Sequence, residues 1–330
     1  MRLLRVRGES GLDLVEYDDR SIPPYAILSH TWGAKEEEVS HKDLLENDGT
    51  RKTGYQKLTF CAKQAVKDGL SHLWVDTCCI DKSSSAELAE AINSMFRWYH
   101  DSAQCYVYLS DVTTNMCPAE NDSLCSSCET AFRESKWFTR GWTLQELLAP
   151  RSVRFFSKEE KELGDKSSLE TQIHEITHIP VLALRGTPMR KFCINERLTW
   201  TNNRRTTREE DMAYSLLGIL GISMVPIYGE TVEAAFRRLR REVNYMVRPA
   251  KMTHNSLCIL QNSTQAQRTA SDSCSNFAGT IIRQMLESSC NLEDVVPILP
   301  YTHPSVEFNQ NTDPIVCKSQ YCSHSSLTVR

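Results

Sequence analysis

The feature that most constrains the fold is an alternation of apolar runs and amphipathic segments between residues 25 and 112. The run YAILS at residues 25–29 is typical of a strand buried on both faces of a parallel sheet. Helical and strand periodicities then alternate, with helices expected at 55–68 and 84–99 and strands at 72–80 and 103–112. Strands joined by helices in this order form parallel sheets. The sequence therefore predicts an α/β fold with a doubly wound parallel sheet.

Polar side chains follow the first two of these strands. His30, Trp32 and Gly33 come directly after the first strand, and Asp76 and Asp81 lie toward the end of the second. Open α/β sheets bind ligands at the carboxyl ends of their strands, so all five residues are candidates for a binding site. Two simpler interpretations stay open. The histidine and tryptophan can be satisfied within a loop, and the aspartates can cap the following helix.

A single carboxylate stands out in the apolar segment FTRGWTLQELLAP at residues 138–150. Gly141 allows a tight entry turn and Pro150 ends the segment, so we expect a short helix fixed at both ends, followed by a strand at 152–157. One side of that helix carries leucines, and the other carries Trp142, Gln145, Glu146 and Ala149. Glu146 is then either a positioned acid or base, or a solvated carboxylate paired with Arg140 or Arg151.

Two motifs have metal-ligand spacing but lack the rest of a metal site. Cys125-x-x-Cys128 is not followed by a second well-spaced pair. HEITH at 174–178 matches the H-E-x-x-H pattern of zinc proteases, but Pro180 follows closely and no third ligand is evident. We therefore predict no metal site. The cysteines that lie inside apolar patterns are expected to be buried thiols: Cys61, Cys78, Cys79 and Cys105.

Composition excludes several classes of partner. A net charge of -4 gives no electrostatic argument for nucleic acid or an anionic membrane as a partner. No apolar run reaches the roughly 18 residues of a transmembrane helix, and the N-terminus lacks the pattern of a signal peptide. These observations predict a cytoplasmic protein without a membrane span.

The remaining segments give coarser predictions. A short strand is expected at 12–17, the acidic run at 36–38 is interpreted as a solvated loop, and residues 200–244 form a mostly helical block. Thr207 with Glu210 has the spacing of a capping box, as does Ser84 with Glu87. Beyond about residue 248 the chain becomes rich in Ser, Asn, Gln and Thr. That composition predicts a weakly ordered tail.

Five strings together resemble the fungal HET (heterokaryon incompatibility) domain. They are AILSHTWG at 26–33, WVDTCCID at 74–81, SSSAELAEAINSMFRWY at 83–99, GWTLQELLAP at 141–150 and TTREEDMAYSLLGI at 206–219. Lys82 stands where the family usually has Gln, and Thr231 stands where a Gly usually follows Tyr-Gly-Glu. The resemblance implies a HET domain over residues 1–245, with a TIR-like (flavodoxin-like) core at 1–160, a helical extension at 161–245 and a tail at 246–330.

The resemblance also implies a function. HET domains are death-inducing effectors in non-self recognition between fungal cells. They are similar to TIR domains, and Trp142 to Leu147 resembles the TIR helix whose catalytic glutamate serves NAD cleavage. On this comparison Glu146 is the catalytic residue, and NAD is a candidate substrate rather than a resident cofactor. The residues expected to bind it are His30, Trp32, Gly33, Asp76, Asp81, Arg140 and Trp142.

A second class of function stays open. In it the domain is a non-enzymatic interaction module that signals by homotypic assembly. Under either interpretation the expected partners are further copies of the domain and an upstream incompatibility receptor, for example of the NLR type.

Overall fold

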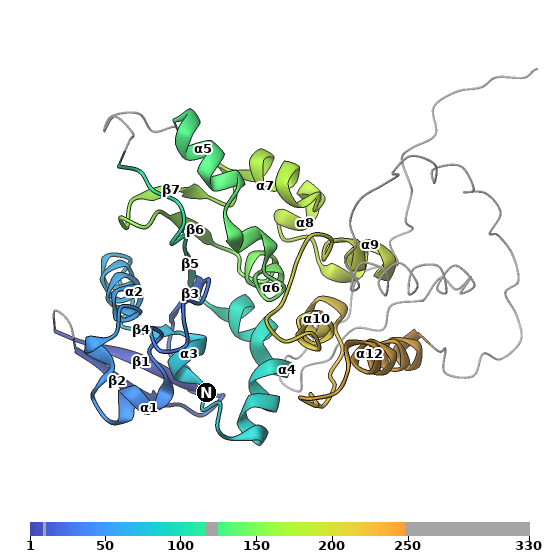
Figure 1. Cartoon of the computed structure of the whole chain (residues 1–330), viewed down its shortest axis with the longest axis horizontal. Coiled ribbons are helices and arrows are strands. Elements are labelled where there is room, and N and C mark those ends of the chain that lie inside the picture. Colours follow the sequence, from blue (N-terminus) through green and yellow to red (C-terminus); the bar gives the residue numbers. More distant parts are fainter. Residues whose placement is uncertain (9–10, 116–124, 248–330) are drawn as a thin grey trace, which may run out of the picture. The chain divides into compact units, whose positions relative to one another are not determined.

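The protein forms an α/β structure around one mixed sheet (Figure 1). The computed structural model describes residues 1–8, 11–115 and 125–247. In these residues seven strands lie side by side in the order β2-β1-β4-β3-β5-β6-β7. Their bounds are β1 (Arg2–Arg7), β2 (Gly11–Glu16), β3 (Ala26–His30), β4 (His72–Trp74), β5 (Gln104–Tyr108), β6 (Val153–Phe156) and β7 (Glu162–Asp165).

The predicted parallel sheet is confirmed at the centre and wrong at the edges. Strands β4, β3, β5 and β6 are parallel neighbours. Strands β1 and β2 form an antiparallel hairpin on one side, and β7 pairs antiparallel with β6 on the other. The alternating pattern at 12–17 suits such an edge strand, because an antiparallel strand can expose one face to water. The strand β1 has no counterpart among the predicted elements.

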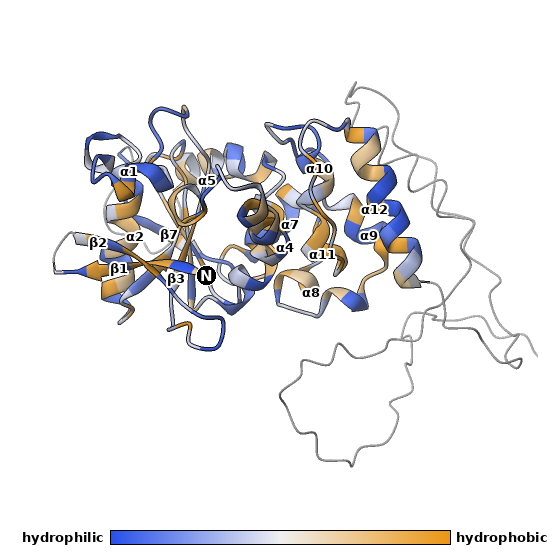
Figure 2. Ribbon diagram, turned by 90° about the horizontal axis from the view of Figure 1, so that it is seen from below, coloured by the Kyte–Doolittle hydropathy of each residue, from blue (hydrophilic) through white to orange (hydrophobic). Residues whose placement is uncertain are grey.

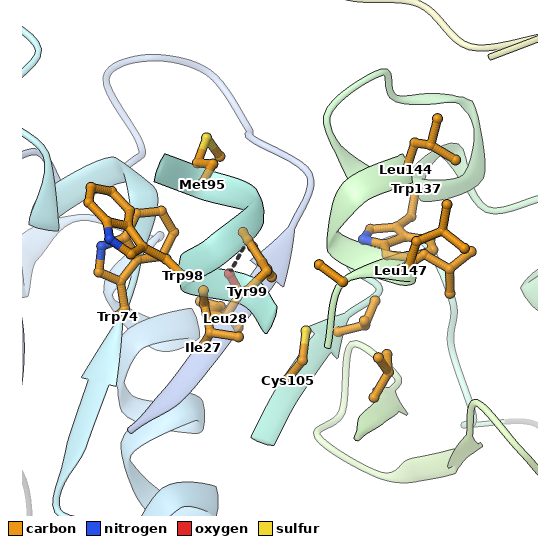
Figure 3. Packing of buried hydrophobic residues seen from close by; sticks show 14 of the residues in the cluster. Ile27, Leu28, Trp74, Met95, Trp98, Tyr99, Cys105, Trp137, Leu144 and Leu147 are labelled. Carbon is orange, nitrogen blue, oxygen red and sulfur yellow. Dashed lines mark hydrogen bonds between the residues drawn. The ribbon is translucent and has the colours of Figure 1, made fainter. Parts of the chain in front are cut away.

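Helices cover both faces of the sheet. On one face, Phe60 of α2 (Tyr55–Lys67) packs against Tyr106, Tyr108 and Phe156. On the opposite face, α4 (Ser85–Asp101) places Trp98 against Trp74. Figure 3 shows this second layer, where the Tyr99 hydroxyl donates to the Leu28 carbonyl. Because successive residues of a strand point to opposite faces, each strand contributes to both layers.

The second predicted strand is shorter than expected. Strand β4 ends at Trp74, and the residues after it form the one-turn helix α3 (Asp76–Cys79). Ser84 caps α4 as predicted, since its hydroxyl accepts from the Glu87 N–H. The Glu87 carboxylate accepts from the Asp81 N–H instead of completing a capping box, and it also pairs with Arg2. That ion pair ties the first strand to the start of α4.

Most helices of the described chain lie after residue 125. They are α5 (Ser126–Arg133), α6 (Thr143–Leu148), α7 (Glu170–Thr177), α8 (Val181–Leu184), α9 (Ile194–Thr199), α10 (Asp211–Tyr214), α11 (Leu217–Leu220) and α12 (Val232–Val247). In the block at 200–244, for which the sequence predicts mostly helix, the regular elements are α10, α11 and most of α12. A further short helix, α1 (His41–Leu45), lies earlier in the chain. Hydrophobic colouring gathers on the strands in Figure 2, whereas α12 carries both hydrophobic and hydrophilic positions.

The helical block packs closely against the α/β core. Helix α11 lies against α4 at Gly218, where an added Cβ atom would lie 2.1 Å from the Phe96 Cβ. Only glycine permits this approach. The predicted capping box at Thr207 is wrong, because no side chain caps α10 and the Thr207 hydroxyl accepts from Arg140. Thr231 fits the start of α12, since its hydroxyl accepts from the Ala234 N–H.

The predicted tail and the predicted lack of a membrane span concern parts of the chain that the structure describes only in part. The tail lies outside them from residue 248 onward. Among the helices that are described, none is long and apolar enough to cross a membrane.

Substitution of Gly141 tests the contact between Thr206 of the helical block and the turn that precedes α6. A Cβ atom added at Gly141 would lie 2.5 Å from the Thr206 Cγ2. We expect Gly141→Ala to lower the free energy of unfolding by about 1–3 kcal/mol through overpacking. Thr206→Ser removes that methyl group and keeps the hydroxyl that donates to the Arg208 carbonyl. The double variant should therefore regain most of the loss in chemical denaturation. Equal losses in the single and double variants would contradict this contact.

Candidate functional site

Helix α6 is buried along its whole length. All six of its residues are shielded from solvent. The last carbonyls of a helix have no partner within it, and burial makes them costly unless donors reach them. At the C-terminal end the Lys166 ammonium donates to the carbonyls of Leu147 (3.3 Å) and Pro150 (2.6 Å). At the entry turn the Arg204 guanidinium donates to the Arg140 carbonyl (2.8 Å) and the Thr143 hydroxyl (2.9 Å). Two buried cations therefore hold this short helix in place.

Glu146 points from α6 into the core, beneath the end of β3. Its side chain is 6% exposed, so the alternative of a solvated surface carboxylate is wrong. The Ser29 hydroxyl donates to the Glu146 Oε2 at 2.5 Å, and the Trp137 indole N–H donates to the same hydroxyl at 2.8 Å. Figure 3 shows Trp137 beside Leu144 and Leu147 of α6. The carboxyl group is thus fixed by a two-step hydrogen-bond relay from neutral donors.

Burial dominates the acidity of Glu146. Loss of water, together with the charge of Asp76, raises its pKa from 4.5 to about 8, although the hydrogen bond from Ser29, the nearby Tyr99 hydroxyl and the charge of Arg140 act in the opposite direction. A carboxyl group with a pKa near neutrality can hold or release a proton, which suits a general acid or base. Burial has the opposite effect on the pKa values of the two buried cations, Lys166 and Arg204. Desolvation lowers the pKa of Lys166 to about 8 and that of Arg204 to about 10.

A second group of side chains lies at the carboxyl ends of β3 and β4. The Lys82 ammonium lies 3.6 Å from the Asp76 carboxylate and 3.9 Å from the centre of the Trp32 ring. Trp32 is 48% exposed. The charge of Asp76 acts on Glu146, so this exposed cluster and the buried carboxyl group belong to one electrostatic neighbourhood.

His30 and Gly33 lie on the opposite face of the sheet, around Glu38. The Glu38 carboxylate accepts from the Gly33 N–H at 2.6 Å and from the Lys57 ammonium at 2.5 Å, and His30 Nε2 lies 3.6 Å away. The prediction of a solvated acidic run is therefore wrong at Glu38, although Glu36 and Glu37 are exposed. Burial alone would raise the pKa of Glu38, but these partners lower it to about 2. This charged cluster anchors the loop after β3.

The other predicted binding residues have structural partners. Asp81 accepts from the backbone and hydroxyl of Ser83, which stabilises the turn before α4. Trp142 hydrogen-bonds the Asp211 carboxylate of the helical block. Arg140 donates to Thr207, yet its charge still acts on Glu146. Of the predicted binding residues, Asp76 and Arg140 act on Glu146 through their charges, Trp32 contacts Lys82, and the others have structural partners.

Several site residues were outside the sequence predictions. Ser29 lies in the run predicted as the first strand, and neither it nor Trp137, Lys166 or Arg204 has a local sequence signal of a site residue. Each acts across a long sequence separation, which periodicity does not report. Tyr99 lies in the predicted helix at 84–99, and the helical pattern gives no indication of a polar role for its hydroxyl. The raised pKa makes Glu146 a candidate functional residue.

The metal motifs do not form metal sites in the described part of the chain. No group of three or more His, Cys, Asp or Glu side chains is arranged there to hold an ion. His174 bonds the Ile179 carbonyl at 2.7 Å, and His178 ends α7 in the left-handed conformation. The two histidines of HEITH are therefore not successive positions of one helix face. The predicted buried thiols are confirmed at Cys61, Cys78, Cys79 and Cys105.

Comparison with known proteins identifies the family. The model of the heterokaryon incompatibility protein (HET) family matches residues 25–130. The vegetative incompatibility protein HET-E-1 of Podospora anserina is 59% identical over 222 residues, which are 67% of this chain and 16% of that protein. The chain carries a HET domain. It spans about a sixth of the length of this relative. No solved structure matches it.

The matched region of the HET domain contains the central strands β3, β4 and β5 with the helices between them. It therefore includes Ser29, Asp76 and Tyr99, which act on the Glu146 carboxyl group, and the exposed Trp32. Helix α6 follows this region in the sequence. The site of the HET domain is thus assembled from the matched strands and a later helix that packs under them.

The raised pKa of Glu146 makes the stability of this HET domain depend on pH in a defined window. An acid whose pKa is higher in the folded state stabilises the fold fully below its unfolded value of 4.5, and this contribution is lost as pH rises toward about 8. Glu146→Gln mimics the neutral carboxyl group. We expect the free energy of unfolding of wild type, relative to that of this variant, to decrease by about 1.4 kcal/mol for each pH unit as the pH rises from 4.5 to about 8. Urea unfolding at several pH values measures it. A difference that is constant across the window would show that Glu146 keeps an ordinary pKa.

Proposed function

We propose that this chain is a cell-death effector in heterokaryon (vegetative) incompatibility, acting through its HET domain. The support is the match to the HET family and the likeness to a relative that is itself a vegetative incompatibility protein. Since the chain spans 16% of that relative, the proposal concerns the part they share. Upstream activation by an incompatibility receptor, for example of the NLR type, and action in the cytoplasm are parts of the same proposal.

We further propose that the α/β core is TIR-like, which belongs to the flavodoxin-like arrangement. The four parallel strands follow the spatial order second, first, third, fourth, which agrees with the flavodoxin-like order. In that arrangement the ligand site lies between the first and third parallel strands, which are β3 and β5 here. The Thr31 and Ser110 hydroxyls meet at 3.4 Å beyond the ends of these strands. Glu146 lies beneath the same strand ends.

The reaction that we propose for this site is NAD cleavage, with Glu146 as the key carboxylate. The observation that carries it is a buried carboxyl group with a raised pKa beneath the ends of the parallel strands, fixed by Ser29. Cleavage of the nicotinamide–ribose bond develops positive charge on the ribose, and a fixed carboxylate stabilises such charge. The same carboxylate would hold the ribose hydroxyls.

Burial of Glu146 implies a closed state in this proposal. At 6% exposure the carboxyl group does not reach a substrate. Movement of α6 would admit NAD and water together. Renewed solvation would lower the pKa of Glu146 toward its ordinary value, so the carboxylate would ionise as the site opens. Assembly of several HET domains is a means of favouring the open state.

The burial of the Glu146 carboxyl group also favours a second candidate function. A HET domain whose carboxyl group stays buried signals by homotypic assembly without chemistry, and Glu146 is then a core residue. The two functions differ in a single measurement. The purified chain, incubated with NAD over a range of protein concentrations, releases nicotinamide only if the domain is an enzyme.

The decisive variant is Glu146→Gln, expressed in fungal cells with NAD content and viability followed together. We expect the protein to fold, to leave NAD unchanged and to lose toxicity, because a neutral amide cannot stabilise the developing charge. Glu175→Gln is the matched control, since Glu175 lies on α7 in an ion pair with Arg133. The Glu175→Gln substitution also removes the glutamate of the HEITH motif. We expect this control variant to kill cells as wild type does. Full NAD turnover by Glu146→Gln would refute the catalytic role.

A further inference from the structure

Trp32, Asp76 and Lys82 meet although they come from three different segments. Trp32 follows β3, Asp76 begins the turn after β4, and Lys82 lies between α3 and α4. The Lys82 ammonium lies 3.9 Å from the centre of the Trp32 ring and 3.6 Å from the Asp76 Oδ2. The Lys82 ammonium thus contacts the face of the Trp32 ring and the Asp76 carboxylate at the same time.

This combination is what a site for an organic cation requires. The face of an indole ring attracts positive charge, and a neighbouring carboxylate adds a fixed negative charge. The Asp76 side chain is only 14% exposed, so its charge is less screened than that of a surface carboxylate. Trp32 is 48% exposed, which leaves its ring accessible from solvent.

The occupant that the structure records is a side chain of the protein itself. Lys82 has a 36% exposed side chain on a flexible four-carbon stem. It can leave the ring by rotation about its own bonds, without movement of the backbone. Because Trp32 and Asp76 belong to other segments of the chain, this rotation does not move the ring or the carboxylate.

We propose that Trp32 and Asp76 form a binding site for a flat organic cation of the pyridinium class, which Lys82 occupies until such a ligand displaces it. A pyridinium ring can stack on the indole with a larger contact than an ammonium makes. The choice of pyridinium rests on the proposed function, since the nicotinamide ring of NAD is a cation of this class. Lys82 then acts as an internal competitor for the same site.

The site is also coupled to Glu146 through charge. The charge of Asp76 acts on the Glu146 carboxyl group. A cation held by Asp76 would therefore influence the residue assigned to the chemistry. Replacement of Lys82 by the ligand keeps a positive charge next to Asp76, so the electrostatic balance around Glu146 is retained.

The test compares a cation with its neutral counterpart on the full chain. Calorimetric titration with 1-methylnicotinamide should show an affinity for Lys82→Gln about tenfold above that of wild type, since removal of a cation–π contact and an exposed ion pair corresponds to about that factor. Lys82→Arg retains the competing cation and should bind as wild type does. Neutral nicotinamide should bind weakly to all three proteins and show no gain.

Two further variants locate the binding site. Trp32→Leu and Asp76→Asn, each combined with Lys82→Gln, should lose the gain in affinity, and Trp32 is exposed enough for its replacement to leave the fold intact. Equal binding of the cation and of neutral nicotinamide would overturn the proposal, as would an unchanged affinity in Lys82→Gln. The probe has no ribose bond to cleave, so its binding is independent of catalysis by Glu146. Failure here and failure of NAD cleavage are therefore separate results.

Discussion

The burial of one carboxyl group governs the arrangement around α6. An isolated ionised carboxylate is too costly to leave in an apolar interior. Glu146 accepts a hydrogen bond from the neutral Ser29 hydroxyl, which itself accepts from the Trp137 indole, and the neutral Tyr99 hydroxyl lies nearby. The nearby buried cations are engaged with the carbonyls of the helix ends. The closed structure therefore favours the protonated form, which explains why the pKa rises to about 8.

Adjacent residues of β3 place two buried carboxyl groups in opposite electrostatic states. Ser29 faces Glu146 on one side of the sheet, and His30 faces Glu38 on the other. Both carboxyl groups lose water on folding. Glu38 gains an ammonium, an imidazole and a backbone N–H, so its pKa falls to about 2, while Glu146 gains mainly neutral partners. The strand thus separates a permanently charged anchor from a carboxyl group that can change protonation.

Local patterns predicted the elements well and the site only in part. The central strands, the helix α2 and the short helix around Glu146 follow from periodicity and from start and stop signals, which depend on neighbouring residues. The antiparallel edges do not, because pairing of β1 and β7 is a long-range choice. Glu38 was misjudged because an acidic run looks solvated until a partner such as Lys57, far along the chain, reaches it. Lys166 and Arg204 were missed for the same reason.

The helical block is part of the enclosure of Glu146 rather than a separate attachment. Lys166 and Arg204 both follow residue 160, and both hold α6. An α/β core that ended at residue 160 would lack the Lys166 ammonium at the carbonyls of the C-terminal end of α6 and the Arg204 guanidinium at the turn that precedes the helix. The block also approaches the core through Gly141 and Gly218, where only glycine fits. A signal that shifts the helical block would therefore act directly on α6, and through it on the solvation of Glu146.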